Sequence, residues 1–479
     1  MNLTKWITNI FARKAAPPPP YSGYGRFVEI NGQITWISDK LSEYVKEGYE
    51  ANDIVYAAVS LVMDKVRIAP WYLYKVEDES SLKRYQSIVS GKFDAKDWAE
   101  ARRLRKKALV PYTSFNTKLG KLNDLLKWPN EYCTWQDMCA DGAGWKMISG
   151  NEMIWANLLA AGANQGVPHE LFHAPAQYMT PYVTRGWPQR ITGWQLNNGI
   201  IQQFTKEEIL HIKMWNPDFD TAGSGLMGMS PLRPGRKTLT RNNAAKKAGA
   251  VQLENNGAAG IAYLDDPIVP ASGREAQISA TKRVWANEQT GADNYGKVAF
   301  SGYKMGYVSV GSTLKEMDLS GIEAVDLRRI FNLWGIPSQL GNDPDNKTYN
   351  SLKEAEKALT TRAALPHLIS KRDHFNRQLQ QHWGFKGVNV VADFDLDVYS
   401  ELQENQKEKW EWISTLPIPI EDQLDLMGLE IPENLPKGII LVDSNKVLLQ
   451  DLIGGQDEMN EENEKLIEAG LKDYLRVAK

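Results

Sequence analysis

The sequence contains very little cysteine, which excludes several classes of protein. Among its 479 residues only Cys133 and Cys139 are cysteines, within the segment Tyr-Cys-Thr-Trp-Gln-Asp-Met-Cys. Two cysteines cannot form a disulfide framework, and their spacing fits neither a CxxC redox pair nor a zinc knuckle. We therefore expect the chain to reside in a reducing compartment such as a cytoplasm.

Long apolar runs and an excess of one charge are also missing. No stretch approaches the roughly 18 uninterrupted apolar residues of a membrane helix. The N-terminus lacks the apolar core of a signal peptide. The 56 basic and 59 acidic residues give a formal charge of −3. The sequence thus predicts no membrane partner and no general attraction to nucleic acid.

The motifs of common enzymes are absent or stand in the wrong context. There is no GxxxxGK[ST] nucleotide-binding loop and no GxSxG nucleophile turn. Residues 223–228 match GxGxxG, but no apolar strand precedes them, so they are interpreted as a flexible lead-in to the next helix. We expect no enzyme activity, no cofactor and no metal site.

One motif leaves an alternative function open. His169, Glu170 and His173 match the HExxH pattern of zinc hydrolases. That chemistry requires both histidines on one face of a helix. Pro168 and Pro175 bracket the motif, so a strand or loop is expected there. A zinc-dependent hydrolase remains the alternative hypothesis.

The composition that is present indicates a globular protein of two to four modules. Hydrophobic residues make up 42% of the chain and charged residues 24%. Residues 21 to about 222 have mixed α and β patterning, interrupted by a charged segment over 77–118 that is interpreted as an exposed insertion. Helices are expected over 52–66 and 135–148, with strands over 69–76, 151–158, 176–184, 191–195 and 209–214.

A long helix is predicted over residues 230–256. Ser230 is a good N-cap, and Pro231 suits the first helical position. The helix has a basic face, which would bind phosphates, face solvent, or pair with acids of another subunit. Its basic residues are Arg233, Arg236, Lys237, Arg241, Lys246 and Lys247. Residues 258–315 then form a small α/β insert, with a helix around 279–288 and strands around 298–301 and 306–310.

The most informative pattern is helix, break, helix between residues 320 and 383. An apolar helical stretch ends at Gly335-Ile-Pro337, and a segment of Asn, Asp, Gly and Pro follows over 341–350. Such a segment favours turns and cannot pack a core, so it predicts a loop held on a rigid frame. A helix is expected over 351–383 and a strand over 387–396.

The two ends of the chain and the tryptophans complete the pattern. Residues 3–11 carry an apolar stripe at helical spacing, which indicates either a frayed tail or a helix that docks on a partner or on the body of the chain. Residues 17–20 form a stiff, extended spacer of four prolines. Residues 457–468 are acidic. Most of the sixteen tryptophans, for example Trp71, Trp128, Trp145 and Trp155, lie in apolar patterns, so we expect them in cores or subunit interfaces.

Five blocks in order over about residues 50–398 resemble phage portal proteins. Gly-Met-Ser-Pro-Leu-Arg at 228–233 is similar to their "G-hydrophobe-S-P-L" signature. Phe-Asn-Leu-Trp-Gly-Ile-Pro-Ser-Gln-Leu-Gly at 331–341, followed by Thr-Tyr-Asn-Ser-Leu, resembles their "F-G-V-P-x-x-L-G … Y-S-N" block. Further matches lie at 52–59, 70–74 and 125–130. Residues 416–426 depart from the "N-E-x-R" helix that this family often shows.

This resemblance implies the head–tail connector of a tailed bacteriophage. The family's fold is α+β and forms a cyclic dodecameric ring at one capsid vertex, for DNA packaging and ejection. Expected partners are its own copies, double-stranded DNA, the terminase large subunit, a head–tail adaptor protein, and the major capsid or scaffolding protein. The expected location is the virion, and the host cytoplasm during assembly.

The resemblance also implies a division of the chain. Residues 1–20 are a terminal segment and spacer, and residues 21–229 with strand 384–398 form a wing. Residues 230–257 and 316–340 are two stem helices, and 258–315 form a clip. Residues 341–350 form a tunnel loop before a long helix over 351–383, and residues 399–479 form a crown with an acidic tail.

The tunnel loop supplies the expected DNA contacts, and no residue is expected to be catalytic. The contact residues are Asn342, Asp345, Asn346, Lys347 and Tyr349. A conduit must bind its cargo weakly, because each neutralised phosphate adds affinity. A single loop lysine, Lys347, repeated around a ring would give weak backbone contacts without reading of bases. Deleting residues 343–347 is expected to leave the ring intact but to impair DNA packaging or retention.

Overall fold

The computed structural model divides into two compact units. It describes residues 40–91, 95–112, 117–184, 186–218, 223–254, 260–264, 278–280, 282–283, 305–309, 319–343, 349–402, 418–427, 441–442 and 447–448, with residues 275 and 413. The first unit comprises Met1–Lys75 and Pro111–Val398, and the second comprises Val76–Val110 and Tyr399–Lys479. Among the described helices, none is long and apolar enough to span a bilayer.

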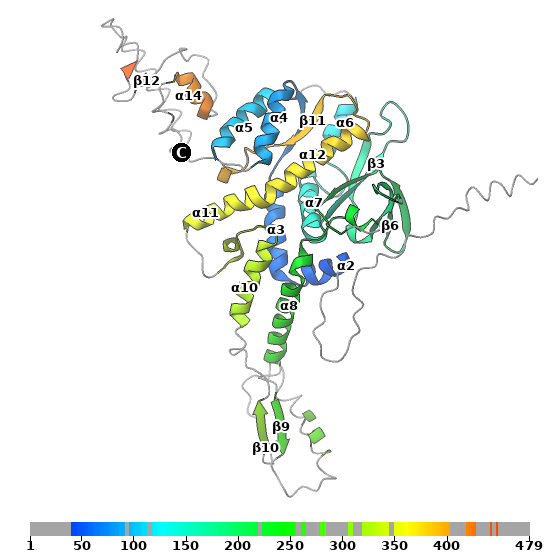
Figure 1. Ribbon diagram of the computed structural model, residues 1–479, viewed down its shortest axis with the longest axis vertical. Helices are drawn as coiled ribbons and strands as arrows, with labels where there is room; N and C mark the ends of the chain where they lie inside the picture. Colours follow the sequence, from blue (N-terminus) through cyan, green and yellow to red (C-terminus); the bar gives the residue numbers. More distant parts are fainter. Residues whose placement is uncertain are drawn as a thin grey trace, which may run out of the picture. The chain divides into compact units, whose positions relative to one another are not determined.

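Two helices form the centre of the first unit (Figure 1). They are α3 (Asp53–Arg67) and α7 (Trp135–Ser149), which pack against each other. The Asn52 side chain accepts a hydrogen bond from the backbone of Val55, as an N-cap does. Thr134 and Asp137 form a reciprocal capping box at the start of α7. Both helices thus begin where their capping residues predict. α2 (Leu41–Glu43), the π-helical η1 (Tyr44–Glu50) and α6 (Thr117–Leu125) accompany them.

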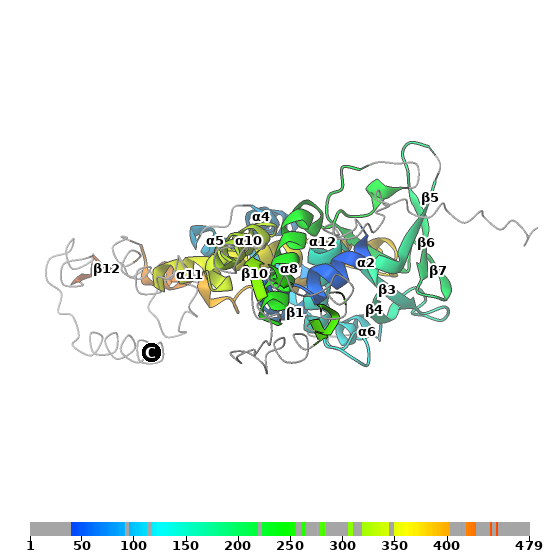
Figure 2. The same cartoon turned by 90° about the horizontal axis from the view of Figure 1, so that it is seen from below.

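Antiparallel sheets cover this centre. β3 (Asn151–Leu158) lies between β4 (Pro168–His173) and β8 (Ile209–Lys213). β5 (Met179–Val183), β6 (Ile191–Asn197) and β7 (Ile201–Thr205) form a second sheet, seen side by side in Figure 2. Trp194 is 1% exposed and packs with Met153 and Met179, so the two sheets share one apolar cluster. β4 and β7 lie where the sequence predicted no definite strand.

A third set of elements joins distant parts of the chain. β1 (Trp71–Val76) pairs antiparallel with β11 (Val390–Phe394), with Trp71 opposite Phe394. α12 (Leu365–Gln381) packs against β11 and α7, and its Lys371 forms a buried ion pair of 2.7 Å with Glu152. Burial opposes ionisation of Glu152, but Lys371 is close enough to lower the pKa of that carboxyl.

The helix expected over 351–383 is continuous but not uniform. It consists of α11 (Tyr349–Ala358), a π-helical segment η6 (Leu359–Ala364) and α12. Pro366 in the first turn of α12 donates no backbone hydrogen bond, and its ring would clash with a carbonyl one turn earlier. The wider π turn before it accommodates this residue, so the helix continues.

Two further helices, α8 (Leu232–Glu254) and α10 (Leu319–Asn332), pack against each other. The strands β9 (Gly260–Leu264) and β10 (Met305–Ser309) lie between them in sequence and pair antiparallel. β10 agrees with the strand expected at 306–310, while β9 was not predicted. The strand expected at 298–301 and most of the helix at 279–288 lie outside the described residues. α10 ends at Asn332, before η5 (Ser338–Gly341).

The second unit corrects the interpretation of residues 77–118 as an exposed insertion. α4 (Glu79–Ser90) and α5 (Ala95–Ala108) pack together there, ahead of the short strand β2 (Leu109–Pro111). Tyr85 is 1% exposed, so this charged sequence has its own apolar contacts. The other described elements of this unit are η7 (Ser400–Leu402), α14 (Ile420–Met427) and the paired β12 (Leu441–Val442) and β13 (Val447–Leu448).

The tryptophan expectation holds in part. Trp71 is buried, and Trp145 and Trp155 are partly buried, whereas Trp128 is 66% exposed in the single chain and so does not lie in its core. Residues 1–20 and the acidic tail at 457–468 lie outside the described residues.

Candidate functional site

The predicted basic face lies on α8, and the predicted loop follows α10. Both helices are joined to the same turn of α7. The Ser230 hydroxyl donates to the carbonyl of Ile148 at 2.5 Å and accepts from the backbone of Leu232 at the start of α8. The Trp334 indole donates to the carbonyl of Met147 at 3.2 Å, just after α10. Neighbouring carbonyls of α7 therefore hold both helices.

Part of the basic face of α8 is neutralised within the same chain. Arg241 forms a two-point ion pair with Asp326 of α10, whose side chain is 0% exposed. This hydrogen-bonded contact raises the pKa of Arg241 above its ordinary value. Acids on another subunit are therefore not needed for Arg241. The pair fixes α8 against α10.

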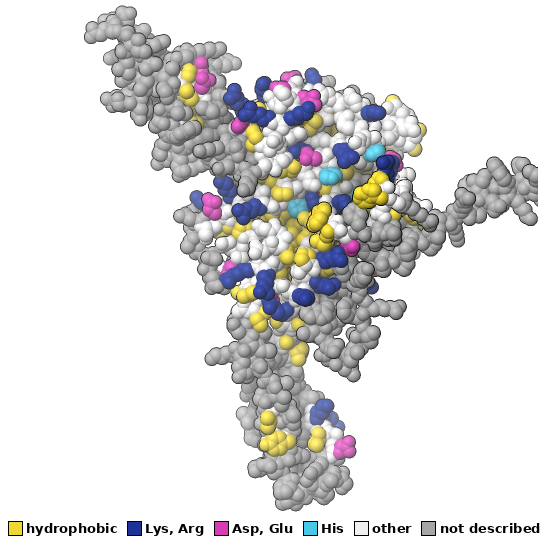
Figure 3. Space-filling view, viewed as in Figure 1, with side chains coloured by type: hydrophobic (Ala, Val, Ile, Leu, Met, Phe, Trp, Pro, Cys, Tyr) yellow, Lys and Arg dark blue, Asp and Glu magenta, His cyan; other side chains and the backbone are white. Residues whose placement is uncertain are grey.

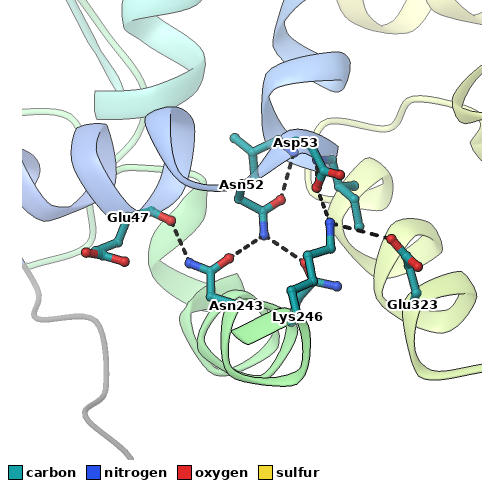
Figure 4. Close-up of polar contacts among 9 residues, drawn as sticks. Glu47, Asn52, Asp53, Asn243, Lys246 and Glu323 are labelled. Carbon is teal, nitrogen blue, oxygen red and sulfur yellow. Dashed lines mark hydrogen bonds and ion pairs between the residues drawn. The ribbon is translucent and has the colours of Figure 1, made fainter. Parts of the chain in front are cut away.

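Lys246 lies at a junction of three helices (Figure 4). Its ammonium group pairs with Asp53 at the start of α3 and lies 3.5 Å from Glu323 of α10. Beside it, the Asn52 amide donates to Asn243 at 2.8 Å and to Asn242 at 2.9 Å, both on α8. The cap of α3 therefore also holds α8 in place.

The remaining basic residues of α8 divide into two kinds. Arg233 lies 4.0 Å from Asp218. Arg236 is half-buried, while Lys237 and Lys247 are exposed, and these three form no ion pair with any residue that the structure describes. On the face seen in Figure 3, Lys and Arg side chains gather over the upper parts of α8 and α10. The cations that stay available for other molecules are thus fewer than the sequence suggests.

Asp343 fixes the near end of the predicted loop. Its side chain is 0% exposed and accepts two hydrogen bonds from Arg328 of α10, at 2.7 and 2.6 Å. The hydroxyl of Ser338 donates to it at 2.7 Å. A buried bidentate Arg–carboxylate pair is among the strongest polar contacts in proteins. The chain therefore leaves α10 along a fixed path.

The structure places two of the five predicted loop residues. Asn342 is exposed and has the left-handed φ of 62°, the only positive φ of a non-glycine residue among those described. Asn tolerates this conformation because its short polar side chain bonds locally. Tyr349 is the first residue of α11. Asp345, Asn346 and Lys347 lie outside the described residues. Their role as DNA contacts stays a prediction.

The HExxH residues do not form a zinc site of the hydrolase kind. They lie on β4, in agreement with the expected strand or loop. His173 lies four residue steps along the strand from His169, a distance of about 13 Å, which is too far for one metal ion. His173 contacts the Met138 carbonyl at 2.9 Å, and Glu170 accepts from Asn157. Among the described residues no cluster of three potential metal ligands occurs.

The cysteines and the GxGxxG segment have structural surroundings. Both cysteines are free, and burial raises the pKa of Cys139 to about 12, which disfavours thiolate chemistry. The GxGxxG segment is not the flexible lead-in that was expected. The backbone of Gly228 donates to Asn151 at 2.6 Å, and Asn216 donates to the carbonyl of Met227 at 3.2 Å. This segment therefore directs the chain into α8.

Sequence reasoning missed the acidic partners. Asp326 and Asp343 are the buried carboxylates of the site, and Asn52 was recognised only as a cap. A signal existed for Asp326, because an Asp inside an otherwise apolar helix needs a cation. The sequence gives no such signal for Asp343, since an Asn-Asp-Pro context is typical of any turn.

Comparison with known proteins shows which family the chain is similar to. The sequence profile of the family described as phage portal protein matches residues 100–416. An uncharacterized protein of Rickettsia bellii (strain RML369-C) is 21% identical over 402 residues, covering 80% of this chain and 88% of that protein. One of Rickettsia felis (strain ATCC VR-1525 / URRWXCal2) is 21% identical over 403 residues, covering 81% and 89%.

Solved structures share the fold. A chain in the neck of a native gene transfer agent (GTA) particle, computed with C12 symmetry, superposes with a TM-score of 0.54 at 19% identity. A chain in the neck of an empty GTA particle, computed with C6 symmetry, gives a TM-score of 0.55 at 20% identity. Each similarity covers 84% of this chain and 96% of the other. The mixed α and β architecture expected from the sequence is confirmed.

Proposed function

Because the chain belongs to the phage portal protein family, we propose that twelve copies of it form a closed ring at one vertex of a capsid. Two related folds occur in particle necks computed with C12 and C6 symmetry, both of which are compatible with twelve subunits. A ring of this kind uses heterologous contacts that close on themselves. The ring is a component of the virion and is assembled in the host cytoplasm.

The division of the chain follows from this assignment. Residues 21–229 with 384–398 form the wing, and α8 and α10 lie within the two stem segments, 230–257 and 316–340. Residues 258–315, which contain the β9–β10 pair, form the clip. Residues 351–383 form the long helix, and 399–479 form the crown.

The anchored loop carries the proposal that DNA passes through the ring. Asp343 and Arg328 hold the chain at the end of α10, and α11 begins again at Tyr349. A short segment fixed at its base is suited to touch a moving duplex without following it. Asn342, Asp345, Asn346, Lys347 and Tyr349 are the proposed contacts.

The function is structural rather than enzymatic, and its partners are macromolecules. During assembly the clip binds the terminase large subunit, and afterwards the head–tail adaptor protein takes its place. The major capsid or scaffolding protein binds the outer part of the ring. No cofactor is proposed. Lys237 and Lys247 on α8, which form no ion pair within the described part of the chain, are available for neighbouring subunits or for the phosphates of DNA.

Electron microscopy of the purified full-length chain tests this proposal. We expect closed rings with a central opening and class averages of twelvefold symmetry. A chain that stays monomeric under all conditions, or that forms open filaments, would overturn it. Zinc analysis of the same sample tests the hydrolase alternative, since one bound zinc per chain that is lost in His173→Ala would favour that function.

A further inference from the structure

The loop between β6 and β7 carries a chemically reactive pair of residues. β6 ends at Asn197 and β7 begins at Ile201, so residues 198–200 form the tip of a hairpin. Asn198 is followed there by Gly199, and within the described part of the chain no other asparagine is followed by glycine. Asparagine is a thermolabile residue, because its side-chain amide can be lost as ammonia. The amide of Asn198 is therefore a candidate for chemical modification.

Glycine after asparagine favours this loss for a steric reason. The backbone nitrogen of the following residue has to reach the side-chain carbonyl carbon, Cγ, of the asparagine. A glycine has no Cβ that would obstruct this approach. Gly199 has a φ of 109°, and even a Cβ placed on it would meet no group beyond its adjacent residues within 4 Å. The space around the attacking nitrogen is thus open.

The side chain of Asn198 is folded back toward this nitrogen. Its Oδ1 lies 3.4 Å from the backbone nitrogen of Ile200, two residues further along the chain. A contact of this kind is an Asx turn, in which the side chain runs beside the backbone that follows it. Cγ of Asn198 is therefore directed toward the peptide of Gly199, whose nitrogen would attack it.

Neither of the two reacting groups is held firmly. Besides the 3.4 Å contact of Asn198, the nitrogen of Gly199 lies 3.5 Å from Oδ1 of Asn197. Both distances exceed the roughly 2.7–3.2 Å of ordinary N–H···O hydrogen bonds. The three residues of the tip are exposed, so water reaches them. The amide and the nitrogen therefore have the freedom and the access to water that the reaction needs.

Two other asparagines of the first unit lack these features and serve as internal controls. Asn151 is 0% exposed, and its amide donates to the carbonyls of Ser149 and Gly228 at 2.9 and 3.0 Å. Asn216 is 4% exposed and precedes Pro217, whose backbone nitrogen carries no hydrogen and cannot attack. The same chain thus offers a buried and a chemically blocked asparagine for comparison.

We propose that Asn198 is a site of spontaneous deamidation. The Gly199 nitrogen loses its proton to a base and forms a bond to Cγ, which closes a cyclic succinimide. The side-chain nitrogen takes up a proton as its bond to Cγ breaks, and it leaves as ammonia. Water then adds to either ring carbonyl and opens the ring, which leaves aspartate or isoaspartate at this position. In sum, the amide and water become a carboxylic acid and ammonia, and no oxidant is consumed.

The modification changes the charge of an exposed sheet edge. No residue from Ile191 to Thr205 is charged, and β7 lies at the edge of the sheet of β5, β6 and β7 (Figure 2). Charged side chains are one means by which proteins keep such edges from pairing with other chains. A carboxylate at position 198, close to the exposed Ile200 and Ile201, gives this hairpin its first charge. Deamidation therefore alters what the edge can contact.

Peptide mapping by mass spectrometry tests the proposal. The full-length chain is incubated at pH 7 and at pH 8, digested, and compared with a synthetic peptide of residues 194–203, which has the same reactive pair without the fold. We expect Asn198 of the folded chain to react at most about tenfold more slowly than the peptide, and about tenfold faster per pH unit because the attacking nitrogen must lose a proton. Both aspartate and isoaspartate should form. Asn151 and Asn216 should stay intact, and Asn198→Gln should remove the signal.

Three results would overturn the proposal. The first is an intact Asn198 in the folded chain under conditions that convert the peptide. The second is a conversion that slows when sucrose stabilises the folded state, since the reaction would then proceed only through unfolded chains. The third is aspartate without isoaspartate, which would exclude the succinimide. None of these readouts depends on whether the chain forms rings.

Discussion

Asp343 is the residue on which the position of the loop depends. The Asp343 carboxylate is 0% exposed, and Arg328 and Ser338 donate hydrogen bonds to its oxygens, as a buried carboxylate requires. The nearby Asn342 adopts a left-handed φ, so the backbone turns sharply just before the anchor. The chain at residues 342–343 is therefore fixed by both backbone and side chain.

Asp343→Asn should destabilise this region. The substitution removes the charge that satisfies Arg328, so we expect the free energy of unfolding to fall by about 1.5–3 kcal/mol, as for other charged hydrogen bonds. Chemical denaturation measures this change. Asp64→Asn is the control, because the Asp64–Arg67 pair is exposed and of the kind that contributes at most about 1 kcal/mol. Equal losses for the two variants would contradict the role of Asp343.

His367 should make stability depend on pH. Its Nδ1 is buried without a partner among the described residues, and burial, with Lys146 and Lys371 nearby, lowers its pKa to about 3. The unfolded chain binds a proton below about pH 6.5, whereas the folded chain does not. Stability is therefore present above pH 6.5 and is lost as the pH falls from about 6.5 to about 3.

His367→Gln should make this acid dependence shallower. One excluded proton contributes at most about 1.4 kcal/mol per pH unit to the slope of unfolding free energy against pH. The measurement is denaturation of both proteins between pH 6 and pH 4. His211, whose pKa is also lowered to about 3 by burial, leaves part of the slope in place. An unchanged slope would show that His367 protonates equally in both states.

At the residue scale, the sequence predicts charges better than their partners. Arg241 and Lys246 were recognised as basic residues of one helix, but Asp326 and Asp53 come from other helices. Such pairings depend on how helices pack, which local patterns do not specify. Trp128 illustrates the same limit, because local context does not separate a core position from a surface one. Its apolar context is the same as that of a core tryptophan, and only the tertiary structure leaves it exposed.

The pairing of α8 with α10 depends on Arg241 at the element scale. Arg241→Met leaves the buried Asp326 carboxylate without its cation, so we expect a loss of about 1.5–3 kcal/mol in unfolding free energy. Adding Asp326→Leu should recover part of this loss, because apolar residues often replace a buried pair without cost. Lys247→Met is the control, and its exposed side chain predicts a change within about 0.5 kcal/mol. No recovery in the double variant would contradict this account.

Shortening the loop should separate assembly from DNA transport. The deletion first expected to leave ring assembly intact while impairing DNA packaging, residues 343–347, includes the anchor Asp343 and would disturb α10. Removing residues 344–348 and joining the ends with two glycines keeps the anchor. We expect rings to form normally, while packaging or retention of DNA falls because the inner contacts are lost. Electron microscopy and a packaging assay measure the two effects. Loss of rings would show that the loop is part of the subunit contacts.

Elements were predictable where local signals agreed. Apolar periodicity located α3 and α7 within a residue or two, and in the structure Asn52 and Thr134 cap the N-termini of these helices. β7 was missed since its residues are largely exposed and lack alternation. The interpretation of residues 77–118 as an exposed insertion was wrong because their few apolar residues are outnumbered by charged ones. The widened turn before Pro366 was also beyond prediction, since proline in a helix suggests a break rather than an adjustment.

For the whole molecule, near neutrality sets how DNA is held. A ring of chains with a formal charge of −3 each has no general affinity for phosphates. The strength of DNA binding therefore depends on individual Lys and Arg side chains near the path of the DNA. We expect Lys347→Ala rings to bind duplex DNA more weakly, with a less steep dependence of log K on log salt concentration and no change in sequence preference. Lys206→Ala is the control on an exposed turn. An unchanged salt slope would exclude Lys347 from the DNA path.

The common attachment of α8 and α10 to α7 has a mechanical consequence. Ser230 and Trp334 bond the carbonyls of Ile148 and Met147, which are consecutive residues in the last turn of α7. A load applied to the far end of either helix, by a motor or by DNA under pressure, would reach the same turn of α7. Gly150 follows directly and leads into β3. Both helices are therefore attached at one turn of α7, directly before the residue that leads into β3.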